Sequence, residues 1–129
     1  MHGTGQQNNM ENLITIWLRA QKLDAESIEY EEVCWAVDEL FYLAHDNHQK
    51  LLNIIVEILK IDSSQQILNA LGAGVIEDVL VHNGDKCIDE IQKLAEYNAN
   101  FKTALGNAYL DKNDVSPNVF RILQQIKNS

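Results

Sequence analysis

Apolar residues recur at the spacing of amphipathic helices along most of this chain. Leu13, Ile14, Trp17 and Leu18 follow the i, i+1, i+4, i+5 pattern that places side chains on one side of a helix. The third apolar stretch, residues 47–59, is apolar around so much of its circumference that we expect a central, buried helix. The whole pattern predicts about eight short helices, over residues 10–23, 28–45, 47–59, 64–71 and 100–110, with three more around Val79, Ile91 and Leu123.

Polar residues between these stretches mark expected helix starts. Asp46 with Gln49 has the spacing of a capping box, in which each side chain bonds to the other residue's backbone N–H. Ser63 with Gln66 has the same spacing. Ser116–Pro117 places a capping serine before a proline at the first helical position, which is a strong start signal for the last helix.

The glycines near the middle of the chain raise the question of a phosphate loop. Gly72 and Gly74 lie where one apolar period stops, and Gly84 lies where the next one stops, so we expect all three to end helices. We expect Asp85 to cap the following helix. The segment LGAGV lacks the lysine, the hydroxyl residue and the preceding strand of a phosphate loop, so no nucleotide or other cofactor is expected.

Short loops between amphipathic helices force neighbouring helices to run antiparallel. We therefore expect an all-α fold, either a HEAT-like α-solenoid or an irregular helical bundle. The polar residues 1–9 are expected to form a disordered tail, and residues 10–129 a single domain.

Composition restricts the cellular setting. The chain has 129 residues, of which 46% are apolar, as in a globular protein. Its N-terminal residues lack the charge and the apolar run of a secretory signal, and no apolar run is long enough to span a membrane. Cys34 and Cys87 lie among apolar neighbours, so we expect two buried thiols and no disulfide. These features favour the cytoplasm.

Charge carries the clearest functional signal. A net charge of −9 argues against general binding to nucleic acid, which needs Lys and Arg to neutralise phosphates. From Leu23 to Gln49 there is no Lys or Arg, and the acids in this window form either a solvated helix face or a docking face for a cationic partner. They are Asp24, Glu26, Glu29, Glu31, Glu32, Asp38, Glu39 and Asp46.

Candidate catalytic and metal-ligating residues are few. Asp78 and His82, four apart on one helix, can pair on the surface, but no nucleophile stands beside them in the sequence. His45 and His48 are three apart across an expected helix break, which favours a solvated turn over a zinc site. We therefore predict no catalytic residue and no metal ligand. Trp17 lies at core spacing, as does Trp35, and both are expected to anchor the core, with an interface role as the alternative.

Several segments resemble a family of small bacterial proteins known only as a domain of unknown function. The resemblance covers about residues 11–126, and its most specific part is the Gly-x-x-Glu-Asp-x-Leu block that begins at Gly74. The chain departs from the family where Val75 replaces a proline and Asn83 replaces a histidine, which weakens a chemical role for His82. The resemblance implies a helical fold and no known reaction. The other matching residues are Trp17–Leu18, Trp35–Ala36, Asp38, Leu40, His45–Asp46, Ile88–Asp89, Phe101–Lys102, Ala104–Gly106 and Tyr109.

A non-enzymatic binding protein is the function that these observations favour. We expect an immunity or antitoxin-type protein that holds a basic toxin domain through an acidic face and binds neither nucleic acid nor membrane. The alternatives are a helical-repeat adaptor and a metal-dependent enzyme that uses Asp78 and His82. The expected partner-binding residues are Glu26, Glu29, Glu31, Glu32, Asp38 and Glu39, and the expected structural motif consists of Gly74, Glu77, Asp78 and Gly84.

Overall fold

The computed structural model describes the backbone of residues 2–129 and the side chains from Asn9 onward. No strand occurs in residues 2–129, so the predicted all-α class is confirmed. No helix in this range is both long and apolar enough to cross a membrane. The elements are α1 (His2–Gln21), α2 (Ile28–Asp46), α3 (His48–Ile61), α4 (Gln65–Ala70), the π-helical segment η1 (Leu71–Ile76), α5 (Glu77–Tyr97), α6 (Ala99–Leu105) and α7 (Pro117–Lys127).

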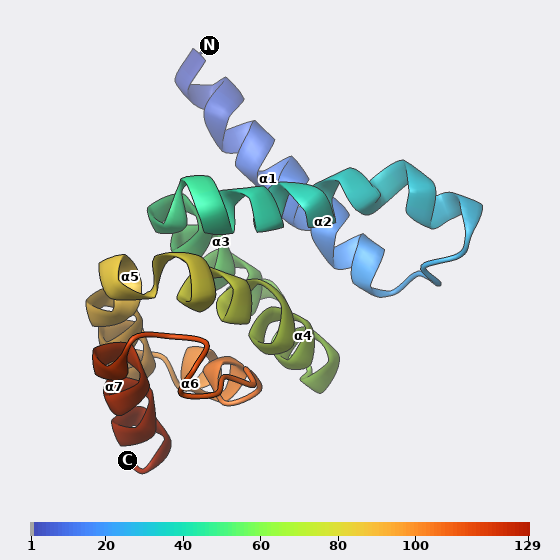
Figure 1. Ribbon diagram of the computed structural model, residues 1–129. Coiled ribbons are helices and arrows are strands. Elements are labelled where there is room, and N and C mark those ends of the chain that lie inside the picture. The colour runs from blue at the N-terminus through green and yellow to red at the C-terminus, as the bar shows by residue number, and fades with distance from the viewer. Residues whose placement is uncertain (1) are drawn as a thin grey trace.

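The helices are fewer and more continuous than the pattern predicts. From Gln65 to Tyr97, α4, η1 and α5 follow one another without a loop, so residues 2–129 hold six separate helical segments and not about eight. The α1 helix begins at His2, within the residues that were expected to form a disordered tail. In Figure 1, α1 and α2 cross at one end of the molecule, α6 and α7 lie at the other, and α3 and the Gln65–Tyr97 segment lie between.

None of the three central glycines has the positive φ angle of a glycine that terminates a helix. Glycine terminates a helix by adopting positive φ, and no residue in the described range does so. Gly72 lies inside η1, where an added Cβ would overlap the carbonyl oxygen of Ala104 in α6. Gly84 lies inside α5, buried against Val119 of α7. These two glycines therefore let other helices approach closely. The helix end predicted at Gly72 and Gly74 was wrong, whereas the break predicted at Gly84 corresponds to a kink in α5 at the preceding residue, Asn83.

Of the three predicted helix caps at Ser116, Asp46 and Ser63, the structure confirms one. Ser116 caps α7, since its hydroxyl accepts from the Val119 N–H, as predicted. The α3 cap is Asn47 and not Asp46, because the Asn47 side chain accepts from the Lys50 N–H. Ser63 caps nothing: α4 follows Ser64, whose backbone N–H donates to Asp62.

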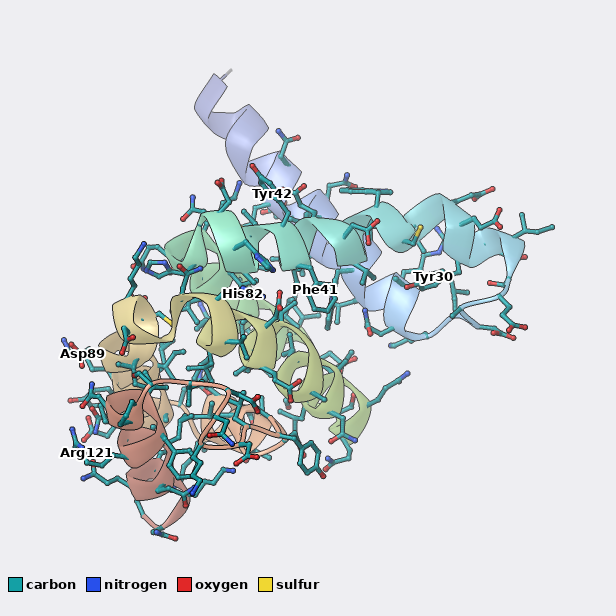
Figure 2. All side chains as sticks on the ribbon, in the orientation of Figure 1. Tyr30, Phe41, Tyr42, His82, Asp89 and Arg121 are labelled. Carbon is teal, nitrogen blue, oxygen red and sulfur yellow. The ribbon has the colours of Figure 1, made fainter. Side chains whose placement is uncertain are left out.

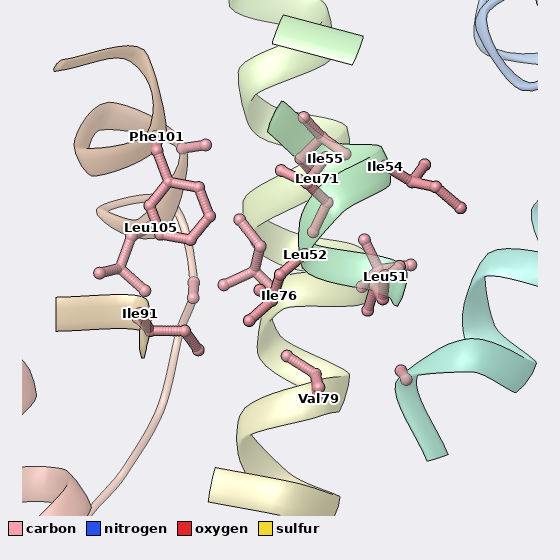
Figure 3. Close-up of a cluster of buried hydrophobic side chains, with 14 of the residues drawn as sticks. Leu51, Leu52, Ile54, Ile55, Leu71, Ile76, Val79, Ile91, Phe101 and Leu105 are labelled. Atoms are coloured by element: carbon pink, nitrogen blue, oxygen red, sulfur yellow. The ribbon is translucent and has the colours of Figure 1, made fainter. Parts of the chain in front are cut away.

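The core confirms the central position of α3. Leu51, Ile54, Ile55 and Ile58 are fully buried, and they belong to one cluster of apolar side chains to which every helix contributes. Figure 3 shows α3 side chains facing those of η1, α5 and α6, with Phe101 at the α6 side. Burial of this cluster, at roughly 25 cal/mol per Å² of apolar surface, is the main stabilising contribution.

Candidate functional site

The α2 helix buries one face and exposes the other. Val33, Ala36 and Leu40 pack inward. The outward positions carry large aromatic side chains as well as acids: Trp35 is 45% exposed and Tyr42 is 58% exposed. The prediction that Trp35 anchors the core was therefore wrong, whereas Trp17 is buried as predicted. Figure 2 shows Tyr42 on the outer side of α2.

Acids and aromatic residues alternate along this outward face. Glu31, Trp35, Asp38 and Tyr42 are spaced four, three and four residues apart, so their side chains lie along one side of α2. We call these four residues the α2 stripe. Both acids of the stripe are exposed.

The six predicted partner-binding acids do not all belong to the stripe. Glu29 and Glu32 are exposed on α2, Glu26 is exposed in the loop before it, and Glu39 is half-buried. Among side chains from Asn9 onward, none of the six lies within 4.0 Å of a Lys or Arg nitrogen. These six acids therefore form no ion pair with Lys or Arg in this part of the chain.

A hollow lies beside the stripe. Its volume is about 640 Å³, and it opens between α1, α2 and the start of α3. Met10 and Leu13 of α1 line it together with Trp35 and Glu39 of α2. Trp35 is thus both exposed and adjacent to a concave surface, which is the setting of an aromatic interface residue.

A cluster of ionisable side chains lies at the C-terminal end of α2. His45 from the last turn of α2 reaches Asp78 of α5, with 3.0 Å between His45 Nε2 and Asp78 Oδ2. His82 lies one turn after Asp78, and its Nε2 is 3.3 Å from Asp78 Oδ1, as the i, i+4 spacing predicts. The two imidazole rings lie 3.7 Å apart between centroids. Figure 2 places His82 in the space between α2 and α5.

The sequence did not reveal that His45 joins this cluster. The only local signal paired His45 with His48, but His48 belongs to the first turn of α3 and is not part of the cluster. His45 and Asp78 are 33 residues apart in the chain, and only the packing of α2 against α5 brings them together.

Two polar contacts hold this region in place. Asn83 has non-helical backbone angles inside α5, and its side-chain amide donates to the carbonyl oxygens of Ala44 and His45 at the end of α2. Glu77 accepts the backbone N–H of Tyr109 at 2.8 Å. For Glu77, this hydrogen bond is a contact of the kind that the expected structural role requires. Tyr109 lies in the loop after α6, because α6 ends at Leu105, five residues before the end of the helix predicted over residues 100–110.

A smaller hollow follows the kink in α5. It has a volume of about 290 Å³, and His82, Asp85, Lys86 and Ser116 are among its lining residues. The prediction that Asp85 caps a helix was wrong. Asp85 lies inside α5 and accepts the Ser116 hydroxyl at 2.6 Å, so it links α5 to the start of α7.

The two cysteines have different environments. Cys87 is buried, as predicted, and burial together with the nearby charge of Glu90 raises the pKa of its thiol to about 11. Cys34 is only half-buried, so its predicted burial was wrong. Cys34 follows the buried Val33 on α2, so its side chain points about 100° away from that buried position.

The comparisons with known proteins identify a family. A model described as "Family of unknown function (DUF6869)" matches residues 22–129, a range that contains all the candidate sites described above except the α1 side of the larger hollow. This match confirms the resemblance to a small domain of unknown function. No curated protein and no solved structure matches the chain.

Proposed function

We propose that this chain, which belongs to the family of unknown function DUF6869, is a non-enzymatic binding module of the bacterial cytoplasm. In this proposal it neutralises a toxin, as immunity and antitoxin proteins do, and it contacts a basic toxin domain through the exposed face of α2. The observation that carries the proposal is the α2 stripe, in which unpaired acids alternate with exposed aromatic side chains in a segment without Lys or Arg.

Acids and aromatic residues contribute differently to such an interface. A surface of one charge sign attracts an oppositely charged partner and raises the association rate. Salt screens this attraction beyond about 10 Å at roughly 0.1 M, and beyond shorter distances at higher salt. Aromatic side chains such as Trp35 and Tyr42 contribute affinity instead, because they bury a large area at a small cost in conformational entropy. The stripe combines both contributions on one helical face.

The exposed apolar area supports binding over simple solubility. A helix face that serves only as a solvated surface needs its acids but does not need a tryptophan and a tyrosine between them. Ile28, at the start of α2, continues the spacing of the stripe and is 75% exposed. Large exposed apolar side chains between charged ones are common at protein-binding surfaces.

The hollow beside Trp35 supports a second candidate, a scaffold or adaptor protein. Met10, Leu13 and Trp35 give this hollow apolar lining, and its two charged lining residues, Glu39 and Lys50, are of opposite sign, which suits a neutral partner segment. The HEAT-like stacking of helices that the sequence suggested belongs to this second proposal. The two candidates differ in their salt dependence, because apolar docking is not screened by salt.

Affinity capture distinguishes these candidates. The chain is immobilised and exposed to lysate of its own bacterium at about 50 and about 300 mM salt, and retained proteins are identified by mass spectrometry. The toxin-neutralising proposal predicts one dominant basic protein that is lost at the higher salt. A partner that is retained equally at both salts supports the adaptor, and retention of nothing contradicts both.

A further inference from the structure

We propose that His45, Asp78 and His82 form a binding site for a zinc-class divalent transition-metal ion between α2 and α5. These side chains offer two imidazole nitrogens and one carboxylate oxygen, and all three donor atoms lie within 4.8 Å of one another. The acids of the α2 stripe take no part in this site, so the inference is independent of the proposed toxin binding.

The donor set matches the chemistry of zinc. Zn²⁺ binds neutral imidazole nitrogens and carboxylate oxygens at about 2.0–2.2 Å, commonly through three protein ligands with a fourth position open to water or another ligand. Ca²⁺ and Mg²⁺ prefer shells made only of oxygen, and soft Cu⁺ prefers sulfur. Two histidines and one aspartate therefore favour zinc and its neighbours in the transition series.

The spacing of the donor atoms fits a tetrahedral site. Tetrahedral zinc with the usual bond lengths holds its ligand atoms about 3.3 Å apart. His45 Nε2 is 3.0 Å from one Asp78 oxygen, and His82 Nε2 is 3.3 Å from the other. All three donor atoms lie within 4.8 Å of one another, so imidazole rotations that bring the longest separation to about 3.3 Å would place both nitrogens around one ion.

The backbone positions of the ligands are fixed in advance. Asp78 and His82 lie one turn apart on α5, so their side chains project from the same face. Asn83, the next residue, donates a hydrogen bond to the carbonyl oxygen of His45 at 3.2 Å. This hydrogen bond holds the backbone of His45 beside Asp78 and His82, so less conformational entropy of the chain is lost when a metal binds.

The side-chain exposures allow an open coordination position. The side chains of His45 and His82 are 49% and 43% exposed, whereas that of Asp78 is 24% exposed. The cluster is thus covered on the Asp78 side and open to solvent on the imidazole side. An ion held there can take water, or a group from another molecule, as its fourth ligand.

A simpler account is that Asp78 accepts hydrogen bonds from both histidines and binds nothing else. The two accounts predict different results when Zn²⁺ alone is titrated into the purified chain and followed by calorimetry. We expect one equivalent to bind, with at least about tenfold weaker affinity in each of His45→Ala, Asp78→Asn and His82→Ala. His48→Ala is the matched control and should bind like the unchanged chain, because His48 lies outside the cluster.

A second measurement keeps the test decisive if a variant unfolds. Nitrogen-15 NMR of the unchanged chain should show the Nε2 signals of His45 and His82 shifting as Zn²⁺ is added, while those of His48 stay in place. Co²⁺ in place of Zn²⁺ should give the visible spectrum of a tetrahedral site. The proposal is overturned if less than about a tenth of an equivalent binds, if the three variants bind as well as the unchanged chain, or if His48→Ala loses as much affinity.

Discussion

The side-chain amide of Asn83 donates a hydrogen bond to the carbonyl oxygen of Ala44 at 2.7 Å. Ala44 lies in the last turn of α2, where carbonyl groups have no partner within the helix. Asn83 also donates to the next carbonyl oxygen, that of His45. The non-helical backbone of Asn83 thus kinks α5 at the point where its amide satisfies the end of α2.

Removal of this amide should destabilise the fold. Asn83→Ala loses both hydrogen bonds and leaves two carbonyls without that donor, so we expect a loss of about 1–3 kcal/mol in the free energy of unfolding. Asn83→Asp should be at least as harmful, because a carboxylate would face two carbonyl oxygens. Urea unfolding followed by circular dichroism measures both. Asn113→Ala, in an exposed loop, is the control with a change below about 0.5 kcal/mol, and a similarly small change for Asn83→Ala would refute the assignment.

Two glycines of η1 should respond oppositely to alanine. An added Cβ at Gly72 would overlap the Ala104 carbonyl oxygen and lie 2.7 Å from Asn107 Cβ, so Gly72→Ala should cost about 1–3 kcal/mol or more. At Gly74 the nearest atom is Phe41 Cζ at 3.6 Å, an ordinary contact. Gly74→Ala should stabilise by up to about 1 kcal/mol, because alanine favours helical backbone. Thermal unfolding of the Gly72→Ala and Gly74→Ala variants measures both effects. Equal changes in the two variants would contradict the close contact between Gly72 and α6.

The contact between Glu77 and Tyr109 should require an acceptor oxygen in the side chain at position 77 but not the negative charge of the carboxylate. Glu77→Ala removes the partner of the Tyr109 N–H, and we expect a loss of about 1–2 kcal/mol with faster hydrogen exchange at that amide. Glu77→Gln keeps an acceptor oxygen and should retain most of the stability. Hydrogen-exchange NMR of the loop after α6 is the measurement. If both variants exchange like the unchanged chain, the loop is held by other contacts.

The cysteines should differ in reactivity in the folded chain. Burial first, and then the charge of Glu90, raises the pKa of Cys87 from 9.0 to about 11, so at pH 8 its thiolate is about a hundredfold scarcer than that of an ordinary thiol. The raised pKa also means that Cys87 contributes stability below pH 9 and loses it as pH rises through 11. Alkylation followed by peptide mapping should label Cys34 first and Cys87 only after unfolding. Equal labelling of the folded chain would show that the Cys87 region opens readily.

Periodicity predicted the all-helical class and the approximate positions of α2 and α3, because burial of an apolar stripe determines where such helices form. It did not predict that the segment from Gln65 to Tyr97 is continuous. It identified the central role of α3, while the capping signal Ser116–Pro117 identified the start of α7. It did not identify the exposed position of Trp35 on α2. It failed at Gly72 and Gly74, which lie inside η1 and end no helix. Positive φ and close helix contact both favour glycine, and only the position of α6 against Gly72 shows which reason applies.

The candidate sites were predictable only in part. The acidic segment is visible in the sequence, and so is the pair formed by Asp78 and His82. The exposure of Trp35 was not predictable, since it lies one residue before the buried Ala36 and depends on which neighbours cover α2. The third member of the cluster, His45, is brought in by tertiary packing alone, for which its local sequence carries no signal.

The association rate with the basic partner identified by capture tests the central proposal most directly. Glu31→Lys with Asp38→Lys changes the net charge from −9 to −5 on the α2 stripe, and Asp89→Lys with Glu96→Lys makes the same change on exposed α5 positions. Stopped-flow kinetics at low salt should show the first pair slowing association by about tenfold or more, with a weaker salt dependence, and the second pair having a much smaller effect. Equal slowing by both pairs, or by neither, would contradict binding through the α2 stripe.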